Sequence, residues 1–203
     1  MINSKATNLM LIAGIIGFIV MTVSQMLQGS DGGTAGAVAW AASSNDWQWI
    51  MPIRLLAVVF VLIFAVGFNS WARSFNESSG LINLGTHFTL IGVVLLWVSI
   101  TSQAGGFDIA SDSSDPTEAA HALIKLSGMT SWLGGVGFAL GFFIIGIKLY
   151  IDKVGTPILN GLIALLGIIA AVGAFVNWFI WVVGFGLAVL VIGIIGLRKV
   201  MRG

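Results

Sequence analysis

The chain has 203 residues, of which 58% are hydrophobic and only 8% are charged, and its net charge at pH 7 is +1. Soluble domains carry about 25% charged residues, so these few charges cannot cover a water-facing surface. The small net charge excludes attraction of nucleic acid, and the absence of cysteine excludes disulfides, thiolate catalysis and cysteine-ligated metals. The composition predicts an all-α integral membrane protein whose main surrounding is the lipid bilayer.

Six segments are long and apolar enough to cross a bilayer, which takes about 20 mostly apolar residues per helix. In chain order, the expected spans are 8–27, 50–71, 81–103, 126–150, 157–174 and 177–197. The last two come from one uncharged stretch, Pro157 to Leu197, whose helical length of about 60 Å is twice the hydrocarbon thickness. We expect it to reverse at the turn-prone segment Gly173 to Trp178; a kink without reversal is the alternative. The spans predict a single transmembrane domain, residues 1–203, built as three hairpins.

Two longer segments, 28–49 and 104–125, connect spans on the same side of the predicted bundle. The first holds a run of small apolar residues, 34–42, followed by Trp47 and Trp49. This pattern is typical of a short external helix that lies along the membrane interface, with tryptophan at headgroup depth. Six of the eight tryptophans fall near this side. An interfacial belt is one interpretation, and an aromatic pocket on the outer side is the other.

The basic residues are distributed unequally between the two sides of the predicted bundle. Arg54 and Lys125 lie near the side of the longer segments, and the remaining bases lie on the other side. These are Lys5, Arg73, Lys148, Lys153, Arg198, Lys199 and Arg202. Because basic residues favour the cytoplasmic side, we expect a multi-pass protein of the plasma or inner membrane with both termini in the cytoplasm. The sequon at Asn76 would then be cytoplasmic and unmodified.

Ionisable residues within or beside the spans are the first candidates for a functional role. Arg54 lies about one turn inside the second span. It either anchors the helix, by reaching the headgroups or an external carboxylate, or contacts a substrate or a proton; Lys125 has the same two interpretations. His87 lies about two turns inside the third span from its cytoplasmic end. There it is either a hydrogen-bonded packing residue or a functional residue, as part of a proton relay or as a contact to a bound ligand.

The region of the fourth span, 116–150, is longer than a bilayer is thick. We expect its outer turns to stand above the membrane, or the helix to bend near Gly128 or at 134–135. Three ionisable residues share one face of these outer turns: Glu118, His121 and Lys125. Further along, Gly137 and Gly141 form a small-xxx-small pair that lets a neighbouring helix approach closely, either from this chain or from another subunit.

No constellation of residues predicts an enzyme, a cofactor or a metal site. His87 and His121 fall on opposite sides of the membrane, so they cannot clamp one haem. Glu118 and His121 have the spacing of half a di-iron site, but the further Glu ligands that such a site takes from other helices are missing. Catalytic zinc usually needs three protein ligands, which two distant histidines do not provide.

A short motif occurs twice, as Ser24-Gln25 before the first longer segment and as Ser102-Gln103 before the second. A duplicated hairpin is one explanation, and the general frequency of such residues near loops is the other.

The lack of reactive groups, the glycine-rich helix faces and the short cytoplasmic loops favour a non-catalytic subunit or accessory protein. Such a protein would pack, through helix faces and its external side, against other membrane proteins or a second copy of itself. The alternative is a small transporter or channel with a polar path near His87 and Arg54. The candidate residues for a ligand or proton path are His87, Arg54, His121, Lys125 and Glu118.

Overall fold

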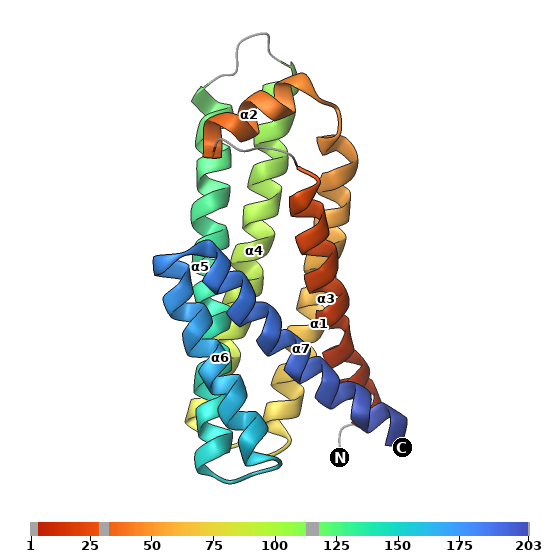
Figure 1. The fold of residues 1–203 in the computed structure, drawn as a ribbon, viewed down its shortest axis with the longest axis vertical. Helices are drawn as coiled ribbons and strands as arrows, with labels where there is room; N and C mark the ends of the chain where they lie inside the picture. Colours follow the sequence, from red (N-terminus) through yellow and green to blue (C-terminus); the bar gives the residue numbers. More distant parts are fainter. Residues whose placement is uncertain (1–3, 29–32, 113–117, 203) are drawn as a thin grey trace.

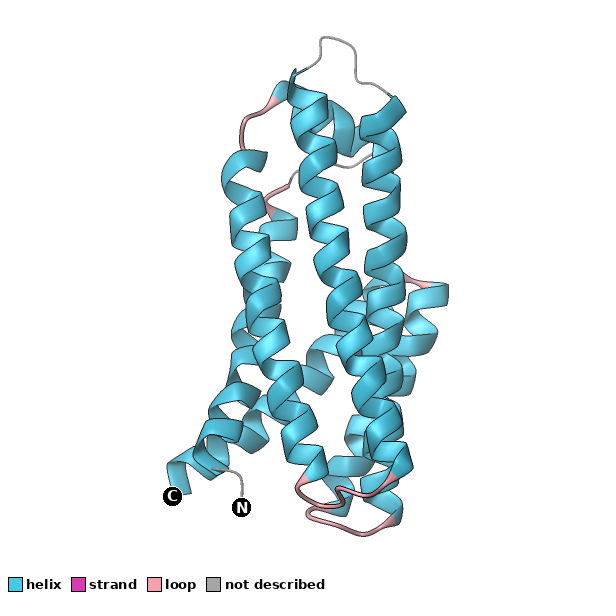
Figure 2. Cartoon of the chain, turned by 180° about the vertical axis from the view of Figure 1, so that it is seen from behind, coloured by secondary structure: helices cyan, strands magenta, loops and turns pink. Residues whose placement is uncertain are grey.

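In a computed structural model, the chain is described over residues 4–28, 33–112 and 118–202. These residues form seven α-helices and no β-strand (Figures 1 and 2). The helices are α1 (Ser4–Met26), α2 (Gly33–Ser43), α3 (Trp47–Arg73), α4 (Gly80–Asp112), α5 (Glu118–Ile151), α6 (Pro157–Val176) and α7 (Trp178–Arg202). Six of those described, all except α2, are long and apolar enough to cross a membrane. The predicted all-α class with six helices that could cross a membrane is therefore confirmed.

The last apolar stretch of the chain is divided into α6 and α7 at Asn177. Pro157 occupies the start of α6, where its missing N–H breaks no helical hydrogen bond. Asn177 has an extended backbone, with φ −161° and ψ 126°, and its side-chain oxygen accepts a hydrogen bond of 2.8 Å from the N–H of Phe179. An asparagine side chain can thus end one helix and cap the next. The chain reverses within the segment that the sequence marks as turn-prone.

Helices α4 and α5 are longer than the predicted third and fourth spans. α4 continues to Asp112, and α5 runs without a break from Glu118 to Ile151. Much of the segment 104–125 is therefore helical rather than an open loop. With 33 and 34 residues, each helix is about 50 Å long, and both extend beyond the turn between α6 and α7 (Figure 1). The glycines at 105 and 106 do not interrupt α4, because Gly106 packs closely against α5 at Ala120 and Ile124.

The six long helices contact one another in a closed ring, in the order α1, α3, α4, α5, α6, α7 and back to α1. α7 runs obliquely across the bundle from α6 to α1, and both termini lie at the same end (Figure 1). α2 crosses the opposite end, where it packs against α4 and α5. Since every consecutive pair of long helices is in contact, the contacts alone do not set three hairpins apart.

The buried apolar residues form two separate clusters. The larger one fills the ring and contains a chain of aromatic rings from α3, α5 and α7, including Phe64, Phe68, Phe138, Phe142 and Phe185. Neighbouring rings in this chain lie 5.2 to 6.1 Å apart between centroids, within the range of favourable aromatic pairs. The smaller cluster lies under α2 and joins it to α3, α4 and α5.

Glycines on both helices allow α4 and α5 to come into backbone contact. A Cβ atom at Gly137 would lie 3.1 Å from the carbonyl oxygen of Phe88 and 3.3 Å from Gly92. One at Gly141 would lie 2.9 Å from the carbonyl oxygen of Gly85. The neighbour of the Gly137–Gly141 pair is thus α4 of the same chain. Small residues at such positions let two helices pack closely in a membrane.

The effect of Gly92→Ala on stability tests this contact. A Cβ at Gly92 would lie 2.8 Å from the carbonyl oxygen of Gly134 and 2.9 Å from the amide nitrogen of Phe138. We expect the substitution to lower the free energy of unfolding by about 1–3 kcal/mol, as overpacking does, measured by denaturation in mixed micelles. Gly105→Ala on the same helix is the control: its Cβ would meet only Leu123, at 3.6 Å, so the higher helix propensity of alanine should leave stability equal or raised. Equal effects of both substitutions would contradict the packing.

Candidate functional site

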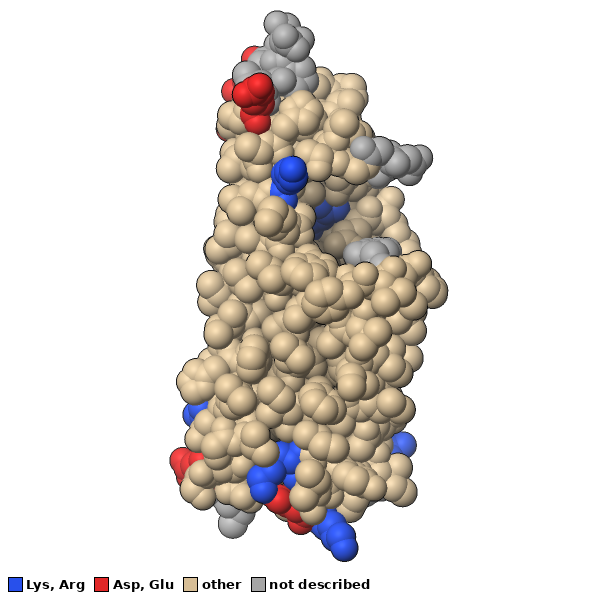
Figure 3. Space-filling model, turned by 90° about the vertical axis from the view of Figure 1, so that its left-hand side faces the viewer, with Lys and Arg blue, Asp and Glu red and all other residues tan. Residues whose placement is uncertain are grey.

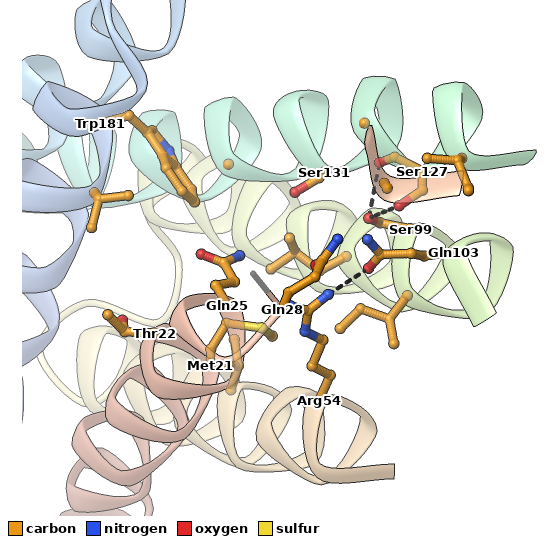
Figure 4. A pocket seen from close by; sticks show the side chains of 18 of the residues that line it. Met21, Thr22, Gln25, Gln28, Arg54, Ser99, Gln103, Ser127, Ser131 and Trp181 are labelled. Carbon is orange, nitrogen blue, oxygen red and sulfur yellow. Dashed lines mark hydrogen bonds between the residues drawn. The ribbon is translucent and has the colours of Figure 1, made fainter. Parts of the chain in front are cut away.

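A cavity of about 670 Å³ lies between the two buried clusters, close to the end covered by α2. Side chains of α1, α3, α4, α5 and α7 form its walls, and the first residues of α2 form part of its lining. Figure 4 shows the polar side chains that face this space. Figure 3 shows a hollow on one side of the molecule, with basic surface inside it, whereas the middle of this face carries no charged residue.

Arg54 is the charged residue among the described residues of the cavity wall. It lies on α3, two turns after the helix begins, and only 2% of its surface is exposed. Its Nη1 donates a hydrogen bond of 2.8 Å to Oε1 of Gln103 on α4. Its Nη2 donates a bond of 2.9 Å to the carbonyl oxygen of Ser24 on α1, and its Nε lies 3.4 Å from the hydroxyl oxygen of the same serine. The guanidinium therefore connects three helices.

The acceptors that surround Arg54 are neutral. Within the described part of the chain, the single ion pair is Lys148–Asp152, so no described carboxylate pairs with Arg54. A buried cation without a counterion is costly, because neutral dipoles replace only part of its hydration. A guanidinium also carries more N–H donors than the three bonded here. The charge and the remaining donors favour a bound anion at this wall.

Further polar groups line the same cavity. Ser99 on α4 donates a hydrogen bond of 2.9 Å to the carbonyl oxygen of Ser127 on α5, and the two hydroxyl oxygens lie 3.1 Å apart. The indole Nε1 of Trp181 is buried and has no hydrogen-bond partner among the described residues. Figure 4 shows Gln25 and Ser131 on neighbouring walls of the space that Trp181 faces. A buried donor without a partner is unusual and costs about 1–3 kcal/mol, so the indole is a second candidate contact for a ligand.

The polarity of the lining changes along the bundle axis. On α3, Val61 lies seven residues after Arg54, and on α4, Leu96 lies seven residues before Gln103. Because seven residues correspond to about 10 Å of helix, the apolar residues lie that much closer to the end that holds the termini. The rest of the apolar part is lined by Phe18, Met21, Val182 and Phe185. The cavity therefore has a polar end beneath α2 and an apolar end above the aromatic chain of the core.

The structure places only one of the five predicted path residues in the cavity, and that residue is Arg54. His87 is exposed on the outer surface of α4, with its Nδ1 2.6 Å from the carbonyl oxygen of Asn83. Glu118, His121 and Lys125 are all exposed on the first turns of α5 and lie outside the cavity lining. The structure thus brings Arg54 together with none of the other four.

The partners of Arg54 belong to the repeated Ser-Gln motif, for which the sequence alone predicts no contact. They are the serine of the Ser24-Gln25 motif and the glutamine of the Ser102-Gln103 motif, so the two copies meet at one side chain. Trp181 is one of the six tryptophans for which the sequence leaves an interfacial belt and an aromatic pocket open. It faces the bundle and lies over Gly135, where a Cβ atom would meet the indole ring at 2.6 Å. The missing side chain of Gly135 provides the space for the indole.

No group of three or more His, Asp or Glu residues in the described ranges could hold a metal ion. No family model matches the chain, and neither a curated protein nor a solved structure matches it.

A double-mutant cycle between Arg54 and Gln103 tests the hydrogen bond that connects α3 and α4. We expect Gln103→Leu to lower the free energy of unfolding by about 1–3 kcal/mol, because it removes an acceptor from a buried cation. In an Arg54→Met background the same change should cost much less, since no cation remains to lose its partner. Thr101→Val, an exposed change on the same helix, serves as the control with little effect. Additive losses in the cycle would show that the two side chains do not interact.

Proposed function

We propose that this protein binds an anionic ligand, without chemically converting it, in the cavity at Arg54. The observation that carries the proposal is an arginine with only 2% of its surface exposed. Its guanidinium is bonded to neutral oxygens of Ser24 and Gln103 on the wall of a cavity of about 670 Å³. This volume falls in the range of small-molecule sites, about 300–1,000 Å³. Buried charges that are not explained by an ion pair commonly mark binding sites.

The proposal includes a location in the plasma or inner membrane. In this membrane the end covered by α2 faces outside, and both termini lie in the cytoplasm. The ends of α1, α3, α5 and α7 that lie beside the termini carry Lys5, Arg73, Lys148, Arg198 and Lys199, and basic residues favour the cytoplasmic side. In this orientation α2 is the external helix near the interface, and the six spans form three hairpins that open towards the cytoplasm. The ligand then reaches its site from outside.

The aromatic chain beneath the cavity supports binding rather than open conduction. Phe138 and Phe185 lie 5.5 Å apart between ring centroids, and Phe142 packs against both. These aromatic side chains fill the interior of the helix bundle on the cytoplasmic side of the cavity. A transport cycle through this protein would require them to separate, and it would pass Arg54 but not His87, which faces outward. The non-catalytic accessory role stays a prediction, compatible with a subunit that binds such a ligand.

Thermal unfolding of the purified protein in a neutral detergent tests the proposal. We expect glycerol 3-phosphate or acetate, at ionic strength matched with chloride, to raise the melting temperature in a saturable manner, because ligands stabilise the state that binds them. At a concentration 100 times the dissociation constant, the gain is about 2.7 kcal/mol. Arg54→Gln should remove this response, and Lys125→Gln, an exposed change on α5, should keep it.

A variant that fills the cavity, together with a matched variant outside it, controls for loss of folding. Gly128 lines the cavity, and a Cβ atom there would meet nothing within 4 Å, so the side chain of Gly128→Leu can fill part of the cavity without a backbone clash. Gly80, the first residue of α4, lies outside the cavity, and a Cβ atom there would also meet nothing within 4 Å. Gly128→Leu should lose the anion response and Gly80→Leu should retain it. An equal response in wild type, Arg54→Gln and Gly128→Leu, or no response in wild type, would refute the proposal.

A further inference from the structure

The length of α6 places the cavity relative to the bilayer. α6 has 20 residues, which correspond to about 30 Å, the thickness of the hydrocarbon layer. The turn between α6 and α7 therefore marks one boundary of the hydrocarbon. The indole Nε1 of Trp132 on α5 donates a hydrogen bond of 2.7 Å to the carbonyl oxygen of Ala174, near the end of α6. Because of this bond, Trp132 on α5 lies at the same depth as the boundary of the hydrocarbon layer.

The two ends of the cavity lie on opposite sides of this boundary. Ser131, beside Trp132, lines the cavity at the boundary, and Ser127 lies one turn, about 6 Å, further towards α2. The bond between Ser99 and Ser127 places the polar end of the cavity at headgroup depth, with Arg54 slightly further out. On α7, Trp181 lies one helical turn and Phe185 two helical turns beyond the reversal between α6 and α7. The apolar end of the cavity therefore lies within the hydrocarbon.

The described residues leave an opening towards the cavity on the side of the molecule. Gly33, Thr34 and Ala37 of α2 form part of the lining, so α2 covers the end of the bundle above the polar groups. The hollow in Figure 3 opens on a lateral face, and basic surface is visible inside it. In a bilayer, a lateral opening at the level of the headgroups faces lipid molecules before it faces dissolved solutes.

We propose that the ligand is an anionic phospholipid of the outer leaflet, which enters the cavity sideways. This inference rests on the proposed function and names the ligand class of the same site. The phosphate oxygens accept hydrogen bonds from Arg54, in the charge-assisted geometry that guanidinium groups favour. The first part of the chains lies against Phe18, Val182 and Phe185, and the rest of the chains extends into the bilayer through the opening.

Trp181 adds a contact that a simple anion would not use. Its indole N–H is one of four buried side-chain donors without a partner among the described residues, and it is the one of the four that lines the cavity. It lies nearer the hydrocarbon than the Arg54 bonds. A phospholipid carries acceptor oxygens at its glycerol level, below the phosphate, where this N–H can donate. A free phosphate or carboxylate bound at Arg54 would leave the indole without an acceptor. The pair of donors therefore matches the order of polar groups along a phospholipid.

Native mass spectrometry of lipids that remain on the protein tests this assignment. The protein is released from nanodiscs of equal phosphatidylcholine and phosphatidylglycerol, so that both lipids compete. We expect one retained phosphatidylglycerol on the wild type, preferred about tenfold or more over phosphatidylcholine, as a hydrogen bond to a charged group would give. Arg54→Gln and Gly128→Leu should reduce the ratio to about one, while Lys125→Gln and Gly80→Leu should keep it. Trp181→Phe should lower the retained fraction severalfold without removing the preference for the anionic lipid.

A second arm distinguishes a lipid headgroup from a free phosphate. The melting temperature is measured with glycerol 3-phosphate in nanodiscs that contain phosphatidylcholine alone. A response to glycerol 3-phosphate that depends on Arg54, without retained phosphatidylglycerol, would overturn the lipid assignment and leave the proposed anion site intact. Phosphatidylglycerol retained equally by wild type, Arg54→Gln and Gly128→Leu would show surface lipid only and would also overturn it. If neither probe binds, both the assignment and the proposed function fail. The Gly128→Leu and Gly80→Leu pair decides the result even if Arg54→Gln does not fold.

Discussion

The backbone contact between α4 and α5 supports the part of the molecule that carries the site. Gly85 and Gly92 on α4 face Gly134, Gly137 and Gly141 on α5 at distances that leave no space for side chains. Two helices of about 50 Å can therefore continue together past the turn between α6 and α7. Their projecting ends hold α2 in place. Because α6 and α7 end earlier, the projecting ends are left uncovered on one side, and this difference in length opens the cavity laterally.

Under the proposed function, Arg54 shows how the same framework would serve binding at the expense of stability. A leucine at this position could join the apolar cluster under α2, whereas the guanidinium must recover its lost hydration from Ser24 and Gln103. Three helices supply or receive these bonds, so the cation also fixes the distances between α1, α3 and α4. A site that is only partly satisfied by the protein has interaction energy left for a ligand, which is the usual trade between function and stability.

The sequence predicts the membrane spans better than it predicts the site. Hydrophobic length alone locates six helices, and Asn177 ends α6 within the expected turn, because both depend on local chemistry. The expected third span ends at 103, before Gly105 and Gly106, but the packing of Gly106 against Ala120 keeps this segment helical. The side chain of Arg54 could equally have reached the headgroups; its direction is set by Gln103, a residue 49 positions away. The position and lining of the cavity depend on contacts between helices that are far apart in the sequence. The pattern of a single sequence does not show which helices pair.

The ionisable residues that fall outside the cavity help to define what the cavity recognises. Glu118, His121 and Lys125 lie exposed on the projecting part of α5, where a charge costs little. Arg54 is the charge that the fold encloses among the described lining residues. In the proposed assignment, the enclosed cation selects for charge, and the apolar end about 10 Å away selects for a chain attached to that charge. A dissolved anion satisfies the first requirement alone, whereas an amphiphile in the adjoining leaflet satisfies both and is already present at high local concentration beside the opening.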